Sequence, residues 1–278
     1  MNTNTNTNIG AMESILPSKA PESVTEAADA GFDGLELDVA GPDPGDDPVW
    51  DPASRDRIRR RAAELDLEIP SICLGFLNRG GLTADDPDVR ADARTAIRRS
   101  VDAAAALDAE VVLVPFFGDA TIETDRHRDR VVDGIRRVAD SAEAAGVTLA
   151  LENTRSGAVN RELLERIDSP AVGTYYDVGN AIAYGLDPVD DILTLGEHVA
   201  RVHVKDWDAG RSDDEDGVGS CPIGEGRVDF EACLDALAEI GYDDWIVLET
   251  ASPTDPMADA ETNLNRTREL LERSELGD

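Results

Sequence analysis

The stretch VTLALENTRSGAVNRELLERIDSPAVGTYYDVGN (residues 147–180) contains two short apolar runs with an amphipathic segment between them. The runs at 148–152 and 173–177 are rich in residues that favour strands, and each run ends in an acidic side chain. In segment 161–167 the apolar residues recur at helical spacing. A strand, a helix and a second strand in this order predict a parallel βαβ unit.

The same alternation of apolar strands and amphipathic helices continues along almost the whole chain. We predict eight strands: Ile9–Met12, Gly34–Val39, Glu68–Leu74, Val111–Phe116, Thr148–Glu152, Gly173–Asp177, Ala200–Val204 and Trp245–Glu249. We predict eight helices: Pro21–Ala30, Ser54–Leu65, Asp88–Leu107, Arg126–Ala145, Arg161–Ile167, Pro188–Leu195, Asp229–Ile240 and Asp259–Glu272. Eight strands close a (β/α)8 barrel, so we predict an α/β fold with a single TIM barrel. A doubly wound open sheet fits less well, because no glycine-rich turn follows the first strand.

The bulk composition fits one domain with a substantial core, since 41% of the 278 residues are hydrophobic. No apolar run reaches 18 residues, so we expect no transmembrane helix. The opening residues MNTNTNTN are polar and repetitive, without the basic and apolar parts of a secretory signal. We therefore predict a disordered polar N-terminal tail over residues 1–8 and the barrel over residues 9–278.

The formal charge of −33 is the most unusual bulk feature of the chain. Lysine occurs only at Lys19 and Lys205, and arginine supplies the other cations. Acidic excess with few lysines fits a halophilic protein, in which concentrated salt screens the self-repulsion. The same charge argues against nucleic acid as a partner, because phosphate binding needs a basic surface.

The cysteines bear on the compartment in which the chain works. Cys73, Cys221 and Cys233 are odd in number and show no close pairing along the sequence. Reduced thiols are the simple interpretation, so we expect a cytoplasmic protein.

Four consecutive predicted strands each present one candidate metal ligand at their carboxyl ends: Glu152, Asp177, His203 and Glu249. Each residue alone has an ordinary interpretation, such as a helix N-cap, a loop carboxylate or a core histidine. Together, at one face of a barrel, three carboxylates and one imidazole form a hard site for one divalent metal ion. Mn²⁺, Mg²⁺ or Co²⁺ suit such a site, and Zn²⁺ suits it less well.

The pattern ALEN … YYDVGN … RVHVKD … PIGEGRVDF … VLET, within residues 150–250, resembles the sugar isomerase/epimerase superfamily of xylose isomerase-like TIM barrels. AGFDGLELD at residues 30–38 extends the resemblance over nearly the whole chain. The resemblance implies that the four residues above are the metal ligands. It also implies that Glu152 and Glu249 are the catalytic acid/base pair, facing each other across the substrate.

The chain also departs from some members of this superfamily. Relatives often carry His where this chain has Asn180. The apurinic-site endonucleases of the superfamily need that His and further histidines to hold three zinc ions, and residues 206–227 contain none. We therefore expect one metal ion and no role in DNA repair.

Four further residues are candidates for substrate contact: Glu36, Asn180, Lys205 and Trp207. For Glu36 the alternative is polar packing inside the barrel. For Lys205 it is a salt bridge with a neighbouring acid, and for Trp207 it is ordinary loop packing. PIGEGRVDF could hold a substrate phosphate with its backbone amides. Its alternative is a glycine turn into a helix, with Asp229 as N-cap.

These features predict a divalent-metal-dependent isomerase or epimerase of a sugar or sugar phosphate. A divalent ion at such a site supplies Lewis-acid chemistry, stabilising the ene-diolate formed when the proton next to a ketose carbonyl is lost. A dehydratase of a keto-polyol or keto-acid and a non-catalytic sugar-binding barrel stay open. The expected partner is a small-molecule sugar, with no membrane partner, and the sequence leaves open whether the chain forms a homo-oligomer.

Overall fold

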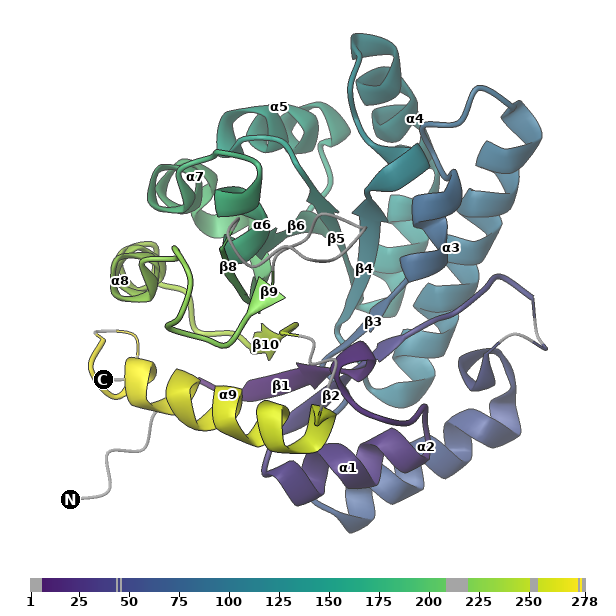
Figure 1. The fold of residues 1–278 in the computed structure, drawn as a ribbon. Coiled ribbons are helices and arrows are strands. Elements are labelled where there is room, and N and C mark those ends of the chain that lie inside the picture. The colour runs from purple at the N-terminus through teal and green to yellow at the C-terminus, as the bar shows by residue number, and fades with distance from the viewer. Residues whose placement is uncertain are drawn as a thin grey trace.

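Eight parallel strands form a closed barrel at the centre of the molecule, with the helices around it (Figure 1). The computed structural model describes residues 7–43, 45, 47–208, 220–250, 255–274 and 276. The barrel strands are β1 (Ile9–Met12), β2 (Gly34–Asp38), β3 (Ser71–Cys73), β4 (Val111–Phe116), β5 (Thr148–Asn153), β6 (Val172–Asp177), β7 (Val199–Val204) and β10 (Ile246–Leu248). They pair in the order β1-β10-β7-β6-β5-β4-β3-β2, which confirms the predicted single TIM barrel.

The helices follow the predicted pattern closely. They are α1 (Glu22–Ala30), α2 (Pro52–Glu64), α3 (Pro87–Leu107), α4 (Asp125–Ala145), α5 (Gly157–Ile167), α6 (Val178–Ala183), α7 (Pro188–Leu195), α8 (Phe230–Glu239) and α9 (Pro256–Leu271). The sequence did not predict α6, which starts directly after β6 with the Asp177 side chain as its N-cap. In the described part of the chain, no helix combines the length and apolar character that crossing a membrane requires.

The strands differ from the sequence prediction at two places, at β3 and after β7. Strand β3 is shorter than the predicted Glu68–Leu74, because Pro70 has no N–H to donate to a ladder. Glu68 still makes an isolated parallel bridge with Gly34. After β7 the chain forms a small antiparallel pair, β8 (Asp206–Trp207) with β9 (Ser220–Cys221), which the sequence did not indicate.

The predicted tail over residues 1–8 falls mostly outside the described residues. Of its two described members, Thr7 is buried. The carbonyl of Asn8 accepts the N–H of Ile246, next to the register in which Ile9 pairs with Ile246. Contact between the first and the last barrel strand thus extends to residue 8.

The barrel interior combines a small apolar cluster with a column of charged side chains. The apolar cluster contains Met12, Cys73, Val111, Leu113, Ala150, Tyr175, Trp245 and Val247. On β7 and just beyond it, Arg201, His203 and Lys205 alternate with Val202 and Val204, which belong to the main hydrophobic core. Because side chains alternate along a strand, the three cations share the face that points into the barrel.

Candidate metal centre

The carboxyl ends of β5, β6, β7 and β10 bring the four predicted ligands together. Each of Glu152, Asp177, His203 and Glu249 offers one ligand atom, and these atoms lie within 4.8 Å of one another. The register explains the convergence, because Asp177 pairs with His203 across β6 and β7, and His203 pairs with Val247 of β10. Parallel strands in a barrel end at the same rim, so residues at matching positions meet there.

The imidazole of His203 is held between carboxylates on both of its nitrogen atoms. Its Nδ1 lies 3.4 Å from Glu152 Oε1 and 3.3 Å from Glu249 Oε2. Its Nε2 lies 2.9 Å from Glu36 Oε1. Burial alone would lower the pKa of His203, but Glu36 and Glu249 raise it well above its usual value. The three acids thus make a strongly negative pocket that favours cations.

Glu36 lies at the opposite edge of the imidazole from Glu152 and Glu249. Its side chain is fully buried. Besides the contact with His203, its Oε2 accepts a hydrogen bond of 2.6 Å from Ser71 Oγ. Both carboxylate oxygens are therefore engaged inside the barrel. This is the polar packing that the sequence offered as the alternative to sugar contact.

The two oxygens of Asp177 have different partners. Its Oδ1 accepts the N–H of Asn180 at 2.8 Å, as helix N-caps do. Its Oδ2 is buried, accepts no hydrogen bond of regular geometry and lies 2.9 Å from the ammonium of Lys205. Burial raises the pKa of Asp177, Lys205 opposes that rise, and Glu249 adds to it. Three carboxylates and one imidazole thus converge on a place that already attracts the positive charge of Lys205, and this oxygen-rich donor set suits a hard divalent ion.

Lys205 lies between two of the candidate ligands. Its Nζ is 2.9 Å from Asp177 Oδ2 and 2.9 Å from Glu249 Oε2. Burial alone would disfavour the charged amine, yet the two carboxylates raise the pKa of Lys205. The salt bridge that the sequence left open is present, and its acidic partners are two of the four candidate ligands.

Asn180 contacts one of the candidate ligands, whereas Trp207 lies on the small β8–β9 pair after β7. The Nδ2 of Asn180 donates to Glu152 Oε1 at 3.4 Å, so the amide supports a ligand. Trp207 is half-buried, and its ring centroid lies 5.8 Å from the guanidinium carbon of Arg227. Residues 209–219, which follow Trp207 closely in the sequence, lie outside the described part of the chain.

Asp206 is an organising residue that sequence reasoning missed. Its Oδ1 accepts the backbone N–H groups of Trp207 and Val228, at 2.9 and 3.1 Å. Its Oδ2 accepts those of Gly224 and Gly226, at 2.9 and 2.7 Å. A Cβ at Gly226 would lie 2.2 Å from Asp206 Oδ1, so only glycine fits there. The one sequence signal was an acidic residue shortly before a glycine-rich stretch.

These contacts decide between the two interpretations of PIGEGRVDF. Amides in this segment that would cradle a phosphate already donate to Asp206. The segment is instead the glycine turn into α8, and the Asp229 side chain accepts the N–H of Ala232 at the start of that helix.

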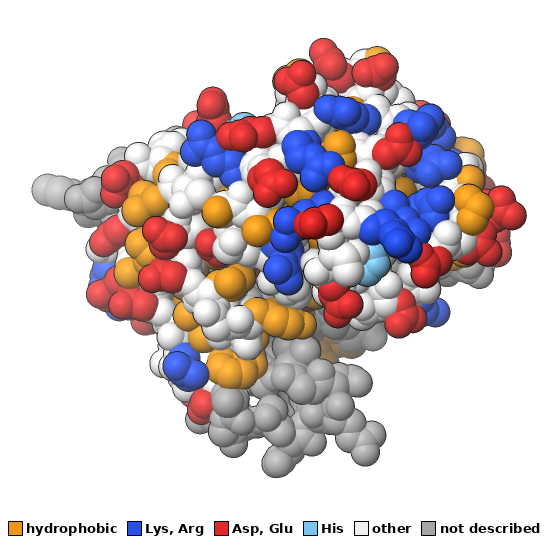
Figure 2. Space-filling view, turned by 90° about the horizontal axis from the view of Figure 1, so that it is seen from above, with side chains coloured by type: hydrophobic (Ala, Val, Ile, Leu, Met, Phe, Trp, Pro, Cys, Tyr) orange, Lys and Arg blue, Asp and Glu red, His pale blue; other side chains and the backbone are white. Residues whose placement is uncertain are grey.

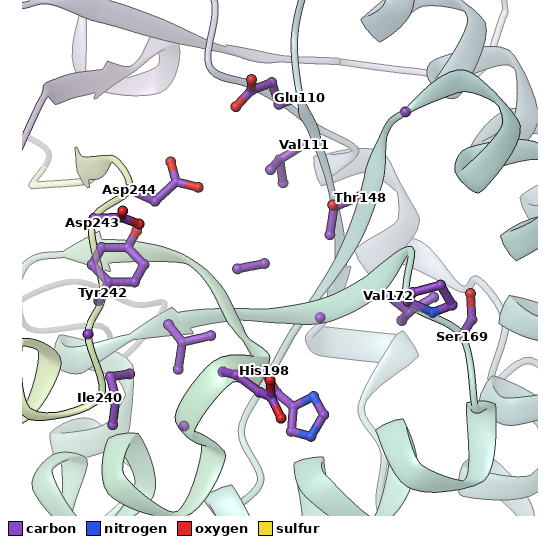
Figure 3. A pocket seen from close by; sticks show the side chains of 18 residues that line it. Glu110, Val111, Thr148, Ser169, Val172, His198, Ile240, Tyr242, Asp243 and Asp244 are labelled. Atoms are coloured by element: carbon purple, nitrogen blue, oxygen red, sulfur yellow. The ribbon is translucent and has the colours of Figure 1, made fainter.

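A hollow of about 720 Å³ lies at the other end of the barrel (Figure 3). Thr148, Val172 and Val199, the first residues of β5, β6 and β7, line it. In Figure 3 the loop carrying Tyr242, Asp243 and Asp244 faces Val172 and Ser169 across this hollow. None of the four candidate ligands lines it, and barrels place catalytic groups at the carboxyl ends of their strands. We therefore assign the functional site to the acidic rim.

Comparison with known proteins relates the whole barrel to a family. The model of the family described as Xylose isomerase-like TIM barrel matches residues 24–273. L-ribulose-5-phosphate 3-epimerase UlaE of Escherichia coli is 29% identical over 270 residues, which cover 90% of each chain.

Two solved structures share the fold. An L-ribulose 3-epimerase aligns with a TM-score of 0.79 at 24% identity, over 96% of this chain and 95% of that one. A D-psicose 3-epimerase from Clostridium cellulolyticum H10, solved with D-tagatose, aligns with a TM-score of 0.77 at 18% identity. That alignment covers 95% of this chain and 99% of the other.

Proposed function

Since this chain belongs to the xylose isomerase-like TIM barrel family, we propose that it is a divalent-metal-dependent epimerase of a ketose or ketose phosphate. The observation that carries the proposal is the convergence of Glu152, Asp177, His203 and Glu249 at the carboxyl rim of the barrel. The similarity to a sugar-phosphate 3-epimerase along 90% of the chain supports the same reaction class. We further propose that the enzyme works in the cytoplasm, with its thiols reduced.

The four clustered residues would hold one Mn²⁺, Mg²⁺ or Co²⁺ ion. When bound, this ion supplies Lewis-acid polarisation of the ketose carbonyl and its neighbouring hydroxyl, which makes the adjacent C–H group more acidic. The Oδ2 of Asp177, which faces Lys205 in the metal-free chain, and the carboxylates of Glu152 and Glu249 would supply the oxygen donors that such an ion prefers.

The two glutamates carry out the proton transfers. They reach the cluster from β5 and from the end of β10, with β6 and β7 between them in the barrel. One carboxylate removes the proton from the carbon next to the carbonyl, and the electron pair moves to form the ene-diolate. The protonated partner on the opposite face then delivers a proton to the same carbon, which inverts its configuration. Two bases on opposite faces favour epimerisation over isomerisation, which needs one base only.

The test uses purified protein loaded with Mn²⁺, Mg²⁺ or Co²⁺, in buffer made with D₂O. We expect a free ketose such as L-ribulose or D-psicose, or L-ribulose 5-phosphate, to be epimerised with deuterium incorporated at C3. Chelation should remove the activity. Aldose products would indicate an isomerase, loss of water a dehydratase, and binding without exchange a non-catalytic barrel; each of these overturns the proposal.

Metal occupancy has its own prediction. Asp177→Ala and His203→Ala should each reduce the bound metal severely, because a small site needs every ligand to keep its geometry. Elemental analysis of the dialysed variants measures this directly. Full occupancy after either substitution would place the metal elsewhere.

A further inference from the structure

Glu36 is a buried charge that the proposed reaction does not use. The structure leaves it no exposed surface, so a sugar hydroxyl has no access to its carboxylate. Its partners come from distant parts of the chain, Ser71 at 35 residues and His203 at 167 residues away. Burying a carboxylate costs free energy of folding unless it is paired and hydrogen-bonded. The contacts of Glu36 with Ser71 and His203 therefore call for an explanation.

The contact between Glu36 and His203 determines which nitrogen of the imidazole carries a proton. An ionised carboxylate only accepts hydrogen bonds, so the nitrogen beside Glu36, which is Nε2, must donate. In the neutral imidazole Nδ1 then has the free lone pair. Nδ1 is also the nitrogen that faces Glu152 and Glu249.

The surroundings hold this arrangement in place. The ring of Tyr175 lies against the imidazole of His203, with centroids 4.2 Å apart and planes tilted by 46°. Ser71, itself buried, donates to the second oxygen of Glu36 and thereby fixes the plane of the carboxylate. A chain of hydrogen bonds therefore runs from Ser71 through Glu36 to His203, which is one of the four candidate ligands.

We infer that Glu36 is a positioning residue, which fixes the tautomer and orientation of His203 so that Nδ1 coordinates the metal ion. The inference rests on the proposed metal-dependent function and deepens it. Carboxylates that orient ligating histidines in this way typically account for about 10–100-fold in metal affinity. Glu36 acts through His203 and does not touch the substrate.

The first experiment measures the metal affinity of Glu36→Gln by calorimetric titration. Glutamine has the same shape, but its amide can donate to Nε2 and leave the proton on Nδ1, where it blocks coordination. We expect affinity to fall by about 10–100-fold. Ser71→Ala should shift affinity in the same direction by a smaller factor.

A matched control is Glu13→Gln. Glu13 is also a buried glutamate, hydrogen-bonded to the backbone N–H of Ala20 and to Ser23 Oγ. This variant should change the melting temperature of the metal-free protein but leave the metal affinity unchanged. Equal affinity loss in both glutamate variants would show a general packing effect and overturn the positioning role.

The second experiment records ¹⁵N-histidine NMR spectra of the zinc-loaded wild-type protein. The chain has three histidines, and His127→Asn and His198→Asn identify the signals of His203 by elimination. We expect a protonated Nε2 and an unprotonated, coordinated Nδ1. Coordination through Nε2, or wild-type affinity in Glu36→Gln, overturns the inference.

These outcomes separate the inference from the proposed function. Zinc bound through Nδ1 in a protein that epimerises no ketose would overturn only the function. Epimerisation together with wild-type metal affinity in Glu36→Gln would overturn only the positioning role. A chain that binds no metal ion overturns both.

Discussion

At the scale of single residues, the ammonium of Lys205 lies between carboxylates where a metal ion would bind. Its ammonium contacts Asp177 Oδ2 and Glu249 Oε2, the same atoms that would bind the metal ion. Like charges in a buried site repel strongly, so the ammonium and a divalent ion compete for these oxygens. Lys205 therefore stabilises the acidic cluster in the metal-free chain and opposes metal binding.

Lys205→Met should separate these two effects. We expect the metal-free variant to melt at a lower temperature, since removing one partner of a buried ion pair costs about 3–5 kcal/mol. We expect its metal affinity to rise by about tenfold or more, equivalent to about 1.4 kcal/mol, because the competing charge is gone. Thermal melts in chelator and calorimetric titration with Mn²⁺ measure the two quantities.

The second lysine of the chain supplies the control. Lys19 also bridges two acids, at 3.1 Å from Glu13 and 3.3 Å from Asp38, but it contacts none of the candidate ligands. Lys19→Met should therefore leave the metal affinity unchanged. If Lys205→Met folds and binds metal no more tightly than wild type, the competition does not exist.

Glu152 and Glu249, the two proposed bases, lie in different environments, and their substitution tests the proposed proton transfers. Glu152 is buried and bonded by Asn180, whereas the Glu249 side chain is 25% exposed and paired with Lys205. Glu152→Gln and Glu249→Gln should each slow epimerisation by at least about 10²–10⁴-fold, the usual contribution of a general acid or base. Each variant should still exchange substrate hydrogen from the face of its surviving carboxylate.

Mass spectrometry of the recovered ketose after incubation in D₂O measures that exchange. Metal content must be checked in the same samples, because both glutamates are also candidate ligands. Turnover within a few-fold of wild type by either metal-loaded variant contradicts the two-base mechanism.

At the scale of elements, Asp206 ties the end of β7 to the start of α8. Four backbone N–H groups converge on its carboxylate, two on each oxygen. An asparagine would turn its NH₂ group toward two of these donors, so two hydrogen bonds would be lost and two donors left unpaired. The turn that follows β7, the strand that carries His203, thus depends on one side chain.

Asp206→Asn should destabilise the fold by about 2–6 kcal/mol, given two donors left unsatisfied at about 1–3 kcal/mol each. Asp229→Asn is the matched control, because asparagine is as good an N-cap as aspartate and only one N–H group is involved. Urea denaturation of both variants measures the difference. Equal stability of the two variants would show that the Asp206 contacts contribute little.

The strand ends show how far the sequence predicts the site. Alternation along RVHVK places Arg201, His203 and Lys205 on one face, and acids at the ends of neighbouring strands predict a shared rim. These are local patterns, so the barrel and the meeting of the four candidate ligands at one rim follow from the sequence. The expected metal-binding, catalytic and substrate-contact roles stay predictions.

The contacts missed by the sequence depend on how the fold brings separate segments of the chain together. Glu36 reaches His203 across 167 residues, and Asp206 reaches Val228 across 22. The alternation of side chains along a strand predicts which face of β2 carries Glu36. It does not predict which side chain Glu36 contacts inside the barrel. The shortening of β3 at Pro70, by contrast, has a local cause that the sequence contains, because proline has no N–H for the ladder.

At the scale of the whole molecule, the surface carries its charge excess in a dispersed form. Figure 2 shows a face on which acidic side chains and arginines are interspersed and not gathered into one block. Several arginines pair with acids one helical turn away, as Arg137 does with Asp133 and Arg161 with Glu165. Such exposed pairs contribute little each, and 59 acidic residues against 26 basic ones leave a large net repulsion.

This repulsion predicts that salt stabilises the protein. The Debye length falls from about 10 Å at 0.1 M salt to about 3 Å at 1 M, so charges across the surface cease to interact. We expect the melting temperature of the metal-free protein to rise steadily with KCl over this range. KCl is the suitable salt, because sulfate would also strengthen apolar burial by exclusion from the surface. Sucrose at matched osmolality controls for excluded volume, and a melting temperature that stays flat or falls in KCl would contradict adaptation to a salt-rich cytoplasm.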